Sequence, residues 1–226
     1  MKCLIIAAHP DDEVLGCGGT VLKLKRNGAK AVVSIFGEGV TSRHAKRDEA
    51  SPEQISEIKQ QARHASRILG VDDITFIDLP DNMFDTVPLL TVVKYCEDLI
   101  RLYSPDMVIT HSLADLNIDH HILARAVLTA VRPCTDAVVR DLLAFEIPSS
   151  TEWSFGQLNG GFNPNVFVDI SAHIDKKIEA FLCYRSEVRN YPHPRSAEAL
   201  RIIAQRWGTV CGCGAAEAFQ VIRALR

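Results

Sequence analysis

The feature that most constrains the fold of this chain is an alternation of short apolar runs with amphipathic stretches over its first 148 residues. The apolar runs occupy residues 3–8, 30–36, 74–79, 106–110 and 141–147. Each run is continuously apolar, as expected of strands in a parallel sheet that helices cover on both faces. The stretches between them predict helices near residues 14–27, 52–69, 88–103 and 119–132. The pattern therefore predicts a Rossmann-like, doubly wound α/β fold with a mostly parallel sheet in the order 3-2-1-4-5.

The clearest helix signal follows Ser51. Ser51 and Gln54 have the spacing of a capping box, Pro52 stands at the first helical position, and Gly70 provides a stop. After residue 148 the pattern loosens, and it predicts one more strand at 165–171 and helices at 172–185 and 196–207. Because no repeat or clear linker interrupts the sequence, we expect one domain over residues 1–226. Residues 149–226 would be an extension at the rim of the site.

Composition excludes several classes of protein. The formal charge of −3 argues against a nucleic-acid surface held by bulk charge. No run of 18 apolar residues occurs, so we expect no membrane span, and the first residues are typical of a strand rather than a signal peptide. The seven cysteines are an odd number and are scattered, which favours a reduced, cytoplasmic protein.

Two polar loops follow strands that the predicted order makes neighbours. "HPDDE" (9–13) follows the first strand, and "HSLADLNIDHH" (111–121) follows the fourth. In doubly wound sheets the ligand site lies at the carboxyl ends of the strands, where the strand order reverses. The two histidine-rich loops are therefore expected to meet in one site.

The residue types in these loops indicate a metal centre. His9 and Asp12 are three residues apart, so one tight turn can aim both at a single point. A histidine from the second loop would complete a set of two histidines and one carboxylate with open positions, which is typical of catalytic zinc and can also hold Fe(II). Asp11 would then stay free as a general base for a metal-bound water that attacks a carbonyl.

Plainer interpretations exist for the same residues. Asp11 could cap a helix, with Asp12 and Glu13 placed favourably in its first turn, and His9 could be an ordinary hydrogen-bonded histidine. A nucleotide-binding loop fits less well, because "GCGGTV" has Val21 where the G-x-G-x-x-G pattern needs its last glycine. The glycines more naturally allow close packing of the first helix against the sheet.

At these residues the chain resembles the PIG-L/LmbE family of zinc-dependent N-acetylglucosaminyl deacetylases. The resemblance rests on "AHPDDE" (8–13) and "THSLADLNIDHH" (110–121), and extends to "GEGVTSR" (37–43), "LPDNMFD" (79–85) and the tail over 183–219. It implies that His9 and Asp12 bind zinc and that Asp11 is the general base. The third ligand of the family falls at His120, while His121 would begin the following helix.

One position departs from the family. Many members have a histidine three residues before the third ligand, where this chain has Asn117. An asparagine can donate a hydrogen bond to an oxyanion but cannot carry a proton. His111, at the end of the fourth strand, and His193, in the tail motif "HPRS", are the candidates to supply that function.

Further polar residues are candidates for substrate binding. The resemblance suggests that Arg43 contacts substrate hydroxyls or a phosphate. At Arg63, on the capped helix, family members carry an arginine linked to substrate binding. Asp78, Asp81 and Asn82 follow the third strand and could bind sugar hydroxyls. For each of them the alternative is an ordinary solvated, salt-bridged or turn residue.

The sequence and the resemblance together predict a metal-dependent hydrolase. It would remove an N-acetyl group from an N-acetylglucosamine-like sugar or conjugate, giving acetate and a free amine. Zinc is the expected ion, with Fe²⁺ or another divalent metal as alternatives, and a homo-oligomer is possible. The rival functions are hydrolysis of a non-sugar N-acyl intermediate and non-catalytic binding of a sugar or nucleotide.

Overall fold

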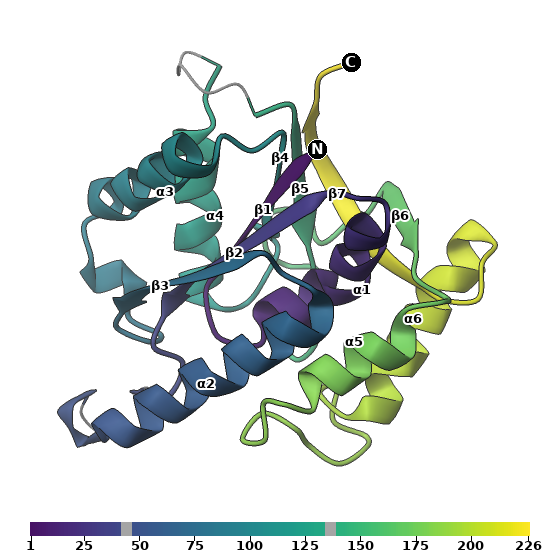
Figure 1. Cartoon of the computed structure of the whole chain (residues 1–226), viewed down its shortest axis with the longest axis horizontal. Helices are drawn as coiled ribbons and strands as arrows, with labels where there is room; N and C mark the ends of the chain where they lie inside the picture. Colours follow the sequence, from purple (N-terminus) through teal and green to yellow (C-terminus); the bar gives the residue numbers. More distant parts are fainter. Residues whose placement is uncertain (42–46, 134–138) are drawn as a thin grey trace.

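The centre of the structure is a mixed sheet in the order β3-β2-β1-β4-β5-β7-β6, seen in a computed structural model that describes residues 1–41, 47–133 and 139–226 (Figure 1). The strands are β1 (Lys2–Ala7), β2 (Lys30–Gly37), β3 (Asp73–Leu79), β4 (Met107–His111), β5 (Asp141–Phe145), β6 (Val166–Asp169) and β7 (Ala216–Ala224). The pairs among β1 to β5 are all parallel. This confirms the doubly wound α/β fold and the order 3-2-1-4-5 predicted from the apolar runs.

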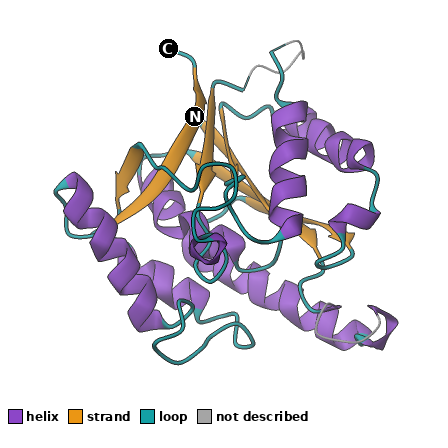
Figure 2. Ribbon diagram, turned by 180° about the vertical axis from the view of Figure 1, so that it is seen from behind, coloured by secondary structure: helices purple, strands orange, loops and turns teal. Residues whose placement is uncertain are grey.

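Helices cover both faces of this sheet (Figures 1 and 2). They are α1 (Asp12–Arg26), α2 (Pro52–Leu69), α3 (Leu89–Tyr103), α4 (Ile118–Ala130), α5 (Ile174–Phe181) and α6 (Ala197–Cys211). One core lies between the sheet and the pair α3 and α4. The other lies between the sheet and the remaining helices. The capping box predicted at Ser51 and Gln54 is present at the start of α2, and Gly70 closes that helix in the left-handed conformation.

The C-terminal part of the chain continues the same sheet. The strand predicted at 165–171 is present as β6, and the helices predicted at 172–185 and 196–207 are present as α5 and α6, whereas β7 was not predicted. β7 runs antiparallel to both β5 and β6 and lies between them. Its sequence "AEAFQVIRA" has a buried Glu217 near its start, so it lacks the continuous apolar run of the first five strands. Glu217 is compensated by Lys177 of α5, whose Nζ lies 2.6 Å from its Oε1.

Close packing brings α1 onto the sheet, as expected from the glycines. A Cβ atom built on Gly16 would lie 2.5 Å from the Phe145 ring. On the other side of the turn after β1, Gly39 has a φ of +77° and its hypothetical Cβ would lie 2.4 Å from Cδ of Pro10. The loops that follow β1 and β2 therefore meet at Pro10, beside the predicted site.

No helix in the described part of the chain has both the length and the apolar character needed to span a membrane.

Candidate metal centre

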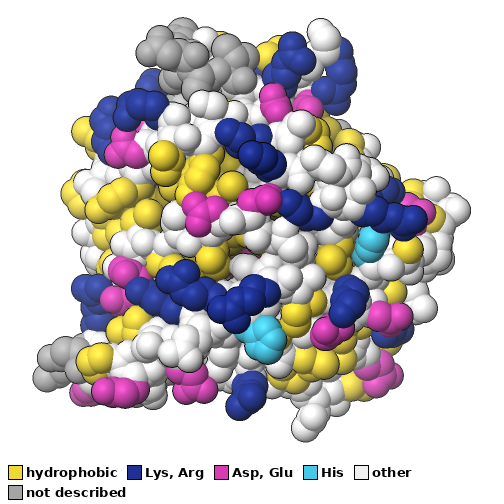
Figure 3. Space-filling model, in the orientation of Figure 1, with side chains coloured by type: hydrophobic (Ala, Val, Ile, Leu, Met, Phe, Trp, Pro, Cys, Tyr) yellow, Lys and Arg dark blue, Asp and Glu magenta, His cyan; other side chains and the backbone are white. Residues whose placement is uncertain are grey.

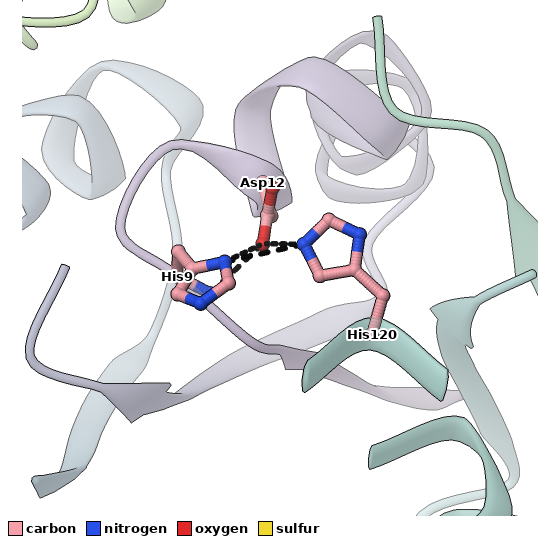
Figure 4. A group of neighbouring side chains, drawn as sticks. All are labelled: His9, Asp12 and His120. Atoms are coloured by element: carbon pink, nitrogen blue, oxygen red, sulfur yellow. Dashed lines mark hydrogen bonds and ion pairs between the residues drawn. The ribbon is translucent and has the colours of Figure 1, made fainter. Parts of the chain in front are cut away.

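Three donor atoms converge where β1 and β4 end: His9 Nδ1, Asp12 Oδ2 and His120 Nε2 (Figure 4). His9 Nδ1 lies 3.2 Å from His120 Nε2 and 3.5 Å from Asp12 Oδ2, and the remaining separation is 3.3 Å. Tetrahedral ligands at about 2.0–2.1 Å from a zinc ion lie roughly 3.3–3.4 Å from one another. The three separations therefore fit one small divalent cation.

The local backbone explains how two of these residues reach the same point. His9 is the second residue after β1, and its N–H donates to Asp12 Oδ2 over 2.8 Å, so the turn is closed by one of the donor residues. The other oxygen, Asp12 Oδ1, is buried and has no hydrogen-bond partner among the described residues. An unpartnered buried carboxylate oxygen is costly, and a cation bound through Oδ2 would neutralise the charge of this buried carboxylate.

In each of the two histidines, the ring nitrogen that does not face the centre lies close to a carboxylate. Asp119 Oδ2 lies 2.9 Å from His9 Nε2, and Asp115 Oδ1 lies 3.0 Å from His120 Nδ1. The backbone N–H groups of Asn82 and Phe84 donate to Asp119, at 2.6 and 2.9 Å. Such carboxylates fix the orientation and tautomer of metal-binding imidazoles. Neither Asp115 nor Asp119 was predicted as a site residue from the sequence. Both are acidic residues of the second polar loop, and this acidity was the signal that could have pointed to them.

The charges of this group shift its protonation. Burial disfavours the charged form of His120, but Asp12 and Asp115 outweigh it and raise the pKa of His120 to about 9. The pKa of His9 is likewise raised above its usual value, because Asp119 and Asp12 overcome the effect of burial. Without a cation the site therefore favours protons on its histidines, and a metal ion would compete with them.

Asp11 lies next to this group but belongs to a different contact network. It precedes α1 with a φ of 110° and makes no side-chain cap, so the alternative of a capping aspartate is wrong. Instead its Oδ2 accepts a hydrogen bond from Arg195 Nη1 over 3.0 Å, and the same Nη1 lies 3.2 Å from Glu187 Oε2. Burial raises the pKa of Asp11 well above its usual value, and Arg195 opposes that shift.

Glu13 holds the turn that carries Asp11. Its Oε2 accepts the backbone N–H of Asp11 over 3.1 Å, and the hydroxyl of Tyr184 donates to its Oε1. Burial raises the pKa of Glu13 to about 7. Neither Arg195 nor Tyr184 was singled out from the sequence, although both lie in the tail that resembles the family.

The three residues considered for the oxyanion differ in their availability. His111 is buried, its Nε2 accepts the N–H of Ala8 over 2.8 Å, and burial keeps its pKa well below the usual value. Its ring stacks on His120 with centroids 3.9 Å apart. Since its acceptor nitrogen is used by the backbone, this placement does not support the predicted role of His111 as a proton carrier; it favours a packing role beside His120.

Asn117 is the N-cap of α4. Its Oδ1 accepts the N–H of Asp119, and its Nδ2 donates to Asn82 Oδ1, both over 2.8 Å. His193 lies on the segment that carries Arg195; its Nδ1 accepts the N–H of that arginine, and its ring meets Trp153 edge-on. Its Nε2 makes no hydrogen bond within the described residues, so His193 is the candidate with an uncommitted nitrogen.

Of the predicted substrate residues after β3, two approach the centre. Asp81 is buried, and its Oδ1 lies 3.2 Å from His9 Nε2. The backbone of Asn82 contacts Asp119, as described above. Asp78 instead forms an ion pair with Lys59 of α2, with 2.6 Å between Oδ1 and Nζ.

Of the two predicted arginines, only Arg63 lies in the described part of the chain, and it does not reach this centre. Arg43 lies outside the described residues. Arg63 is exposed on α2, and its guanidinium lies 4.9 Å from the centroid of the Phe76 ring on β3. Figure 3 shows basic side chains gathered along the edge between β3 and α2. This placement favours the plainer interpretation of Arg63 as a surface residue that packs on the sheet edge.

Comparisons with known proteins identify the family of the chain. Residues 4–131 match the model of the PIG-L family, described as GlcNAc-PI de-N-acetylase, and the chain belongs to that family. It is 26% identical over 187 residues to a probable N-acetyl-alpha-D-glucosaminyl L-malate deacetylase 2 of Bacillus cereus, covering 81% of this chain and 82% of that protein. The resemblance predicted from "AHPDDE" is thereby confirmed.

Two solved structures share the fold. A conserved protein from Thermus thermophilus is 29% identical with a TM-score of 0.75, covering 99% of this chain and 96% of the other. The N,N'-diacetylchitobiose deacetylase of Pyrococcus horikoshii has a TM-score of 0.77 at 22% identity, covering 98% of this chain and 83% of its own. Family and relatives together assign the chain to the hydrolytic N-deacetylases.

Proposed function

We propose that this protein removes the N-acetyl group from an N-acetylglucosamine-like sugar or conjugate, and that His9, Asp12 and His120 hold the metal ion it needs. The observation that carries this proposal is the convergence of three donor atoms 3.2–3.5 Å apart at the carboxyl ends of β1 and β4. The substrate class follows the names of the relatives, which act on N-acetylated sugars.

The role that we propose for each group follows from its contacts. A bound divalent ion, with zinc as our choice, would polarise the acetamide carbonyl and make water more acidic. Asp11 would accept the proton from that water, and its place between His9 and Asp12 in the turn that carries both ligands supports this role. Arg195 fixes its carboxylate from the other side. The departing amine takes a proton from Asp11 or from His193.

Recognition of the sugar falls to the loop after β3. Asp81 reaches His9, and Asn82 is exposed while its side chain meets that of Asn117. Amide and carboxylate groups of this kind bind sugar hydroxyls through paired hydrogen bonds. We propose these two residues, rather than Asp78 or Arg63, as the sugar contacts.

The experiment that tests this function measures metal content and acetate release together. Asp11→Asn should keep the metal of the wild type and lose at least about 100-fold in turnover, since it removes only the general base. Asparagine tolerates the left-handed backbone found at position 11, so the fold should be kept. Near wild-type turnover in this variant would exclude Asp11 as the base.

A matched pair of variants tests the third ligand. His120→Ala should lose the metal, whereas His121→Ala should keep it, because the His121 ring faces the backbone carbonyl of Asp115 instead of the centre. Metal retained in the first variant would contradict the ligand set. Acetate release should then be assayed on N-acetylglucosamine, its glycosides, its malate conjugate and non-sugar N-acyl amines. Turnover confined to the last group would overturn the sugar assignment.

A further inference from the structure

A concave site is lined by α6, by the segment before it that carries His193 and Arg195, and by the segment that follows β5. It is a groove of about 470 Å³, a size that suits a small organic ligand. Figure 1 shows that segment looping out between α5 and α6 at the bottom of the view. Its apolar lining is Tyr191, Pro192, Pro194, Ile202, Ile203 and Trp207. The exposed fractions of Tyr191 and Ile202 are 57% and 46%, so apolar surface here faces solvent.

The apolar lining of the groove contains one carboxylate, Glu146, that has no counter-ion among the described residues. Glu146 follows β5 and lines the groove, and its Oε1 accepts a hydrogen bond from Trp207 Nε1. No lysine or arginine in the described part of the chain forms an ion pair with it. The two nearby cations are used elsewhere: Lys177 pairs with Glu217, and the Arg206 guanidinium stacks 3.9 Å from the centroid of Trp207.

The groove has a second acidic residue and one basic residue, Arg206. Glu152 also lines it, and its carboxylate accepts the backbone N–H groups of Ser149 and Ser150. The charged lining is thus two carboxylates and one guanidinium, a net negative charge in an otherwise apolar wall. A desolvated carboxylate beside aromatic rings is the environment that attracts an ammonium group attached to an apolar body.

We propose that this groove binds a small amphipathic organic cation, with its ammonium group on Glu146 and its apolar body against Trp207, Tyr191 and Ile202. This site is separate from the proposed metal centre, and it goes beyond deacetylation. It adjoins the segment that carries His193 and Arg195, because Pro192 and Pro194, which line the groove, flank His193. Arg195 Nε also donates to the carbonyl of Pro148, another lining residue, over 3.5 Å.

Binding can be followed by the fluorescence of Trp207 without any assay of activity. The chain has two tryptophans, so Trp153→Phe leaves Trp207 as the sole reporter, provided circular dichroism shows an unchanged fold. Titration with 2-phenylethylammonium at pH 8, where Glu146 is mostly ionised, should give a saturable change in emission. 2-Phenylethanol and 3-phenylpropionate match its body but lack the cation, and both should bind at least 10-fold more weakly.

The carboxylate is tested by Glu146→Gln in the same background. Glutamine keeps the size of the side chain and an oxygen for Trp207 Nε1, but it removes the charge. We expect at least a 10-fold loss of affinity for 2-phenylethylammonium. We expect no loss in Glu198→Gln, which changes an exposed glutamate of α6, the helix that carries Trp207, outside the groove.

Three results would overturn the proposal: no saturable binding of 2-phenylethylammonium, equal affinity for the neutral alcohol, or unchanged affinity in Glu146→Gln. The outcome does not depend on acetate release. The proposal can therefore fail while the deacetylase assignment stands, and the reverse is also true.

Discussion

Arg195 and Asp11 are 184 positions apart in the chain, yet Arg195 Nη1 donates a hydrogen bond to Asp11 Oδ2 over 3.0 Å. The arginine comes from the loop before α6, and the aspartate from the turn before α1. Arg195 is also tied to Glu187 and to the carbonyl of Pro148, so its guanidinium is held from three directions. The tail of the chain thereby orients the proposed general base.

Replacing Arg195 should therefore impair the reaction through Asp11. For Arg195→Gln we expect kcat to fall by about 10- to 100-fold with little change in KM, since a misplaced base costs rate rather than substrate binding. Arg195 lowers the pKa of Asp11, so its removal should move the acidic limb of the pH–rate profile to higher pH. Steady-state kinetics of acetate release across pH would measure both effects.

Conservative variants separate this role from a general loss of structure. Arg195→Lys keeps the positive charge and should recover part of the rate and of the pH profile. Arg201→Gln removes an exposed arginine of α6 that pairs with Asp175, and it should leave both unchanged. If Arg195→Gln lowered kcat without moving the acidic limb, the arginine would not act through Asp11.

The carboxylates behind the histidines should control metal affinity. Asp119→Asn leaves a poorer partner for His9 Nε2, and we expect the affinity for Zn²⁺ to fall by about 10- to 100-fold while the fold is kept. Asp85→Asn is the control: it changes an exposed aspartate in the connection between β3 and α3, the segment whose backbone donates to Asp119. It should leave the Zn²⁺ affinity unchanged. Competition with a chromogenic chelator would give both affinities. An unchanged affinity in Asp119→Asn would mean that His9 does not depend on this carboxylate.

How far the sequence predicted the site depends on the distance over which each contact acts. His9 and Asp12 share one turn, and His120 follows a strand whose neighbour was predictable from strand order, so the sequence could bring these residues together. Asp115 and Asp119 were visible as acids, but which nitrogen of which histidine each would face depends on side-chain geometry. Periodicity and spacing do not contain that information.

The contacts made by the tail of the chain could not be predicted from periodicity and spacing either. Arg195 meets Asp11 only because residues 182–196 fold back across the carboxyl ends of the strands. β7 was missed for a related reason: its Glu217 is stabilised by Lys177 from another element, and the backbone N–H groups of Gly19 and Thr20 donate to it. A strand with a buried charge shows no apolar run, so its partners must be known before it can be recognised.

The ionisation of Glu146 should make stability depend on pH. Burial raises the pKa of Glu146 from an ordinary value of 4.5 to about 7. The folded state then holds a proton that the unfolded state has lost, so the contribution of Glu146 to the free energy of unfolding should fall as pH rises from 4.5 to 7 and stay level above it. Glu146→Gln lacks this penalty. It should be more stable than the wild type by roughly 1–3 kcal/mol at pH 8 and equal to it near pH 4.

Urea denaturation of both proteins at the two pH values would test this. Glu198→Gln, on the exposed side of α6, serves as the reference for a change of charge without burial. A Glu146→Gln variant that was no more stable than wild type at pH 8 would show that Glu146 ionises in the folded state as easily as in the unfolded one.

The contact between α1 and β5 gives a prediction about the scaffold of the site. A methyl group on Gly16 would lie 2.5–2.9 Å from three atoms of the Phe145 ring, which is fully buried, so the helix or the ring would have to move. Gly16→Ala should therefore destabilise the protein by about 1–3 kcal/mol, despite the better helix propensity of alanine. Gly18→Ala is the matched control, because its nearest neighbour is a Val14 methyl group at 3.3 Å, and it should cost less. Equal free energies of unfolding for the two variants would show that α1 is not held against β5 by this close approach.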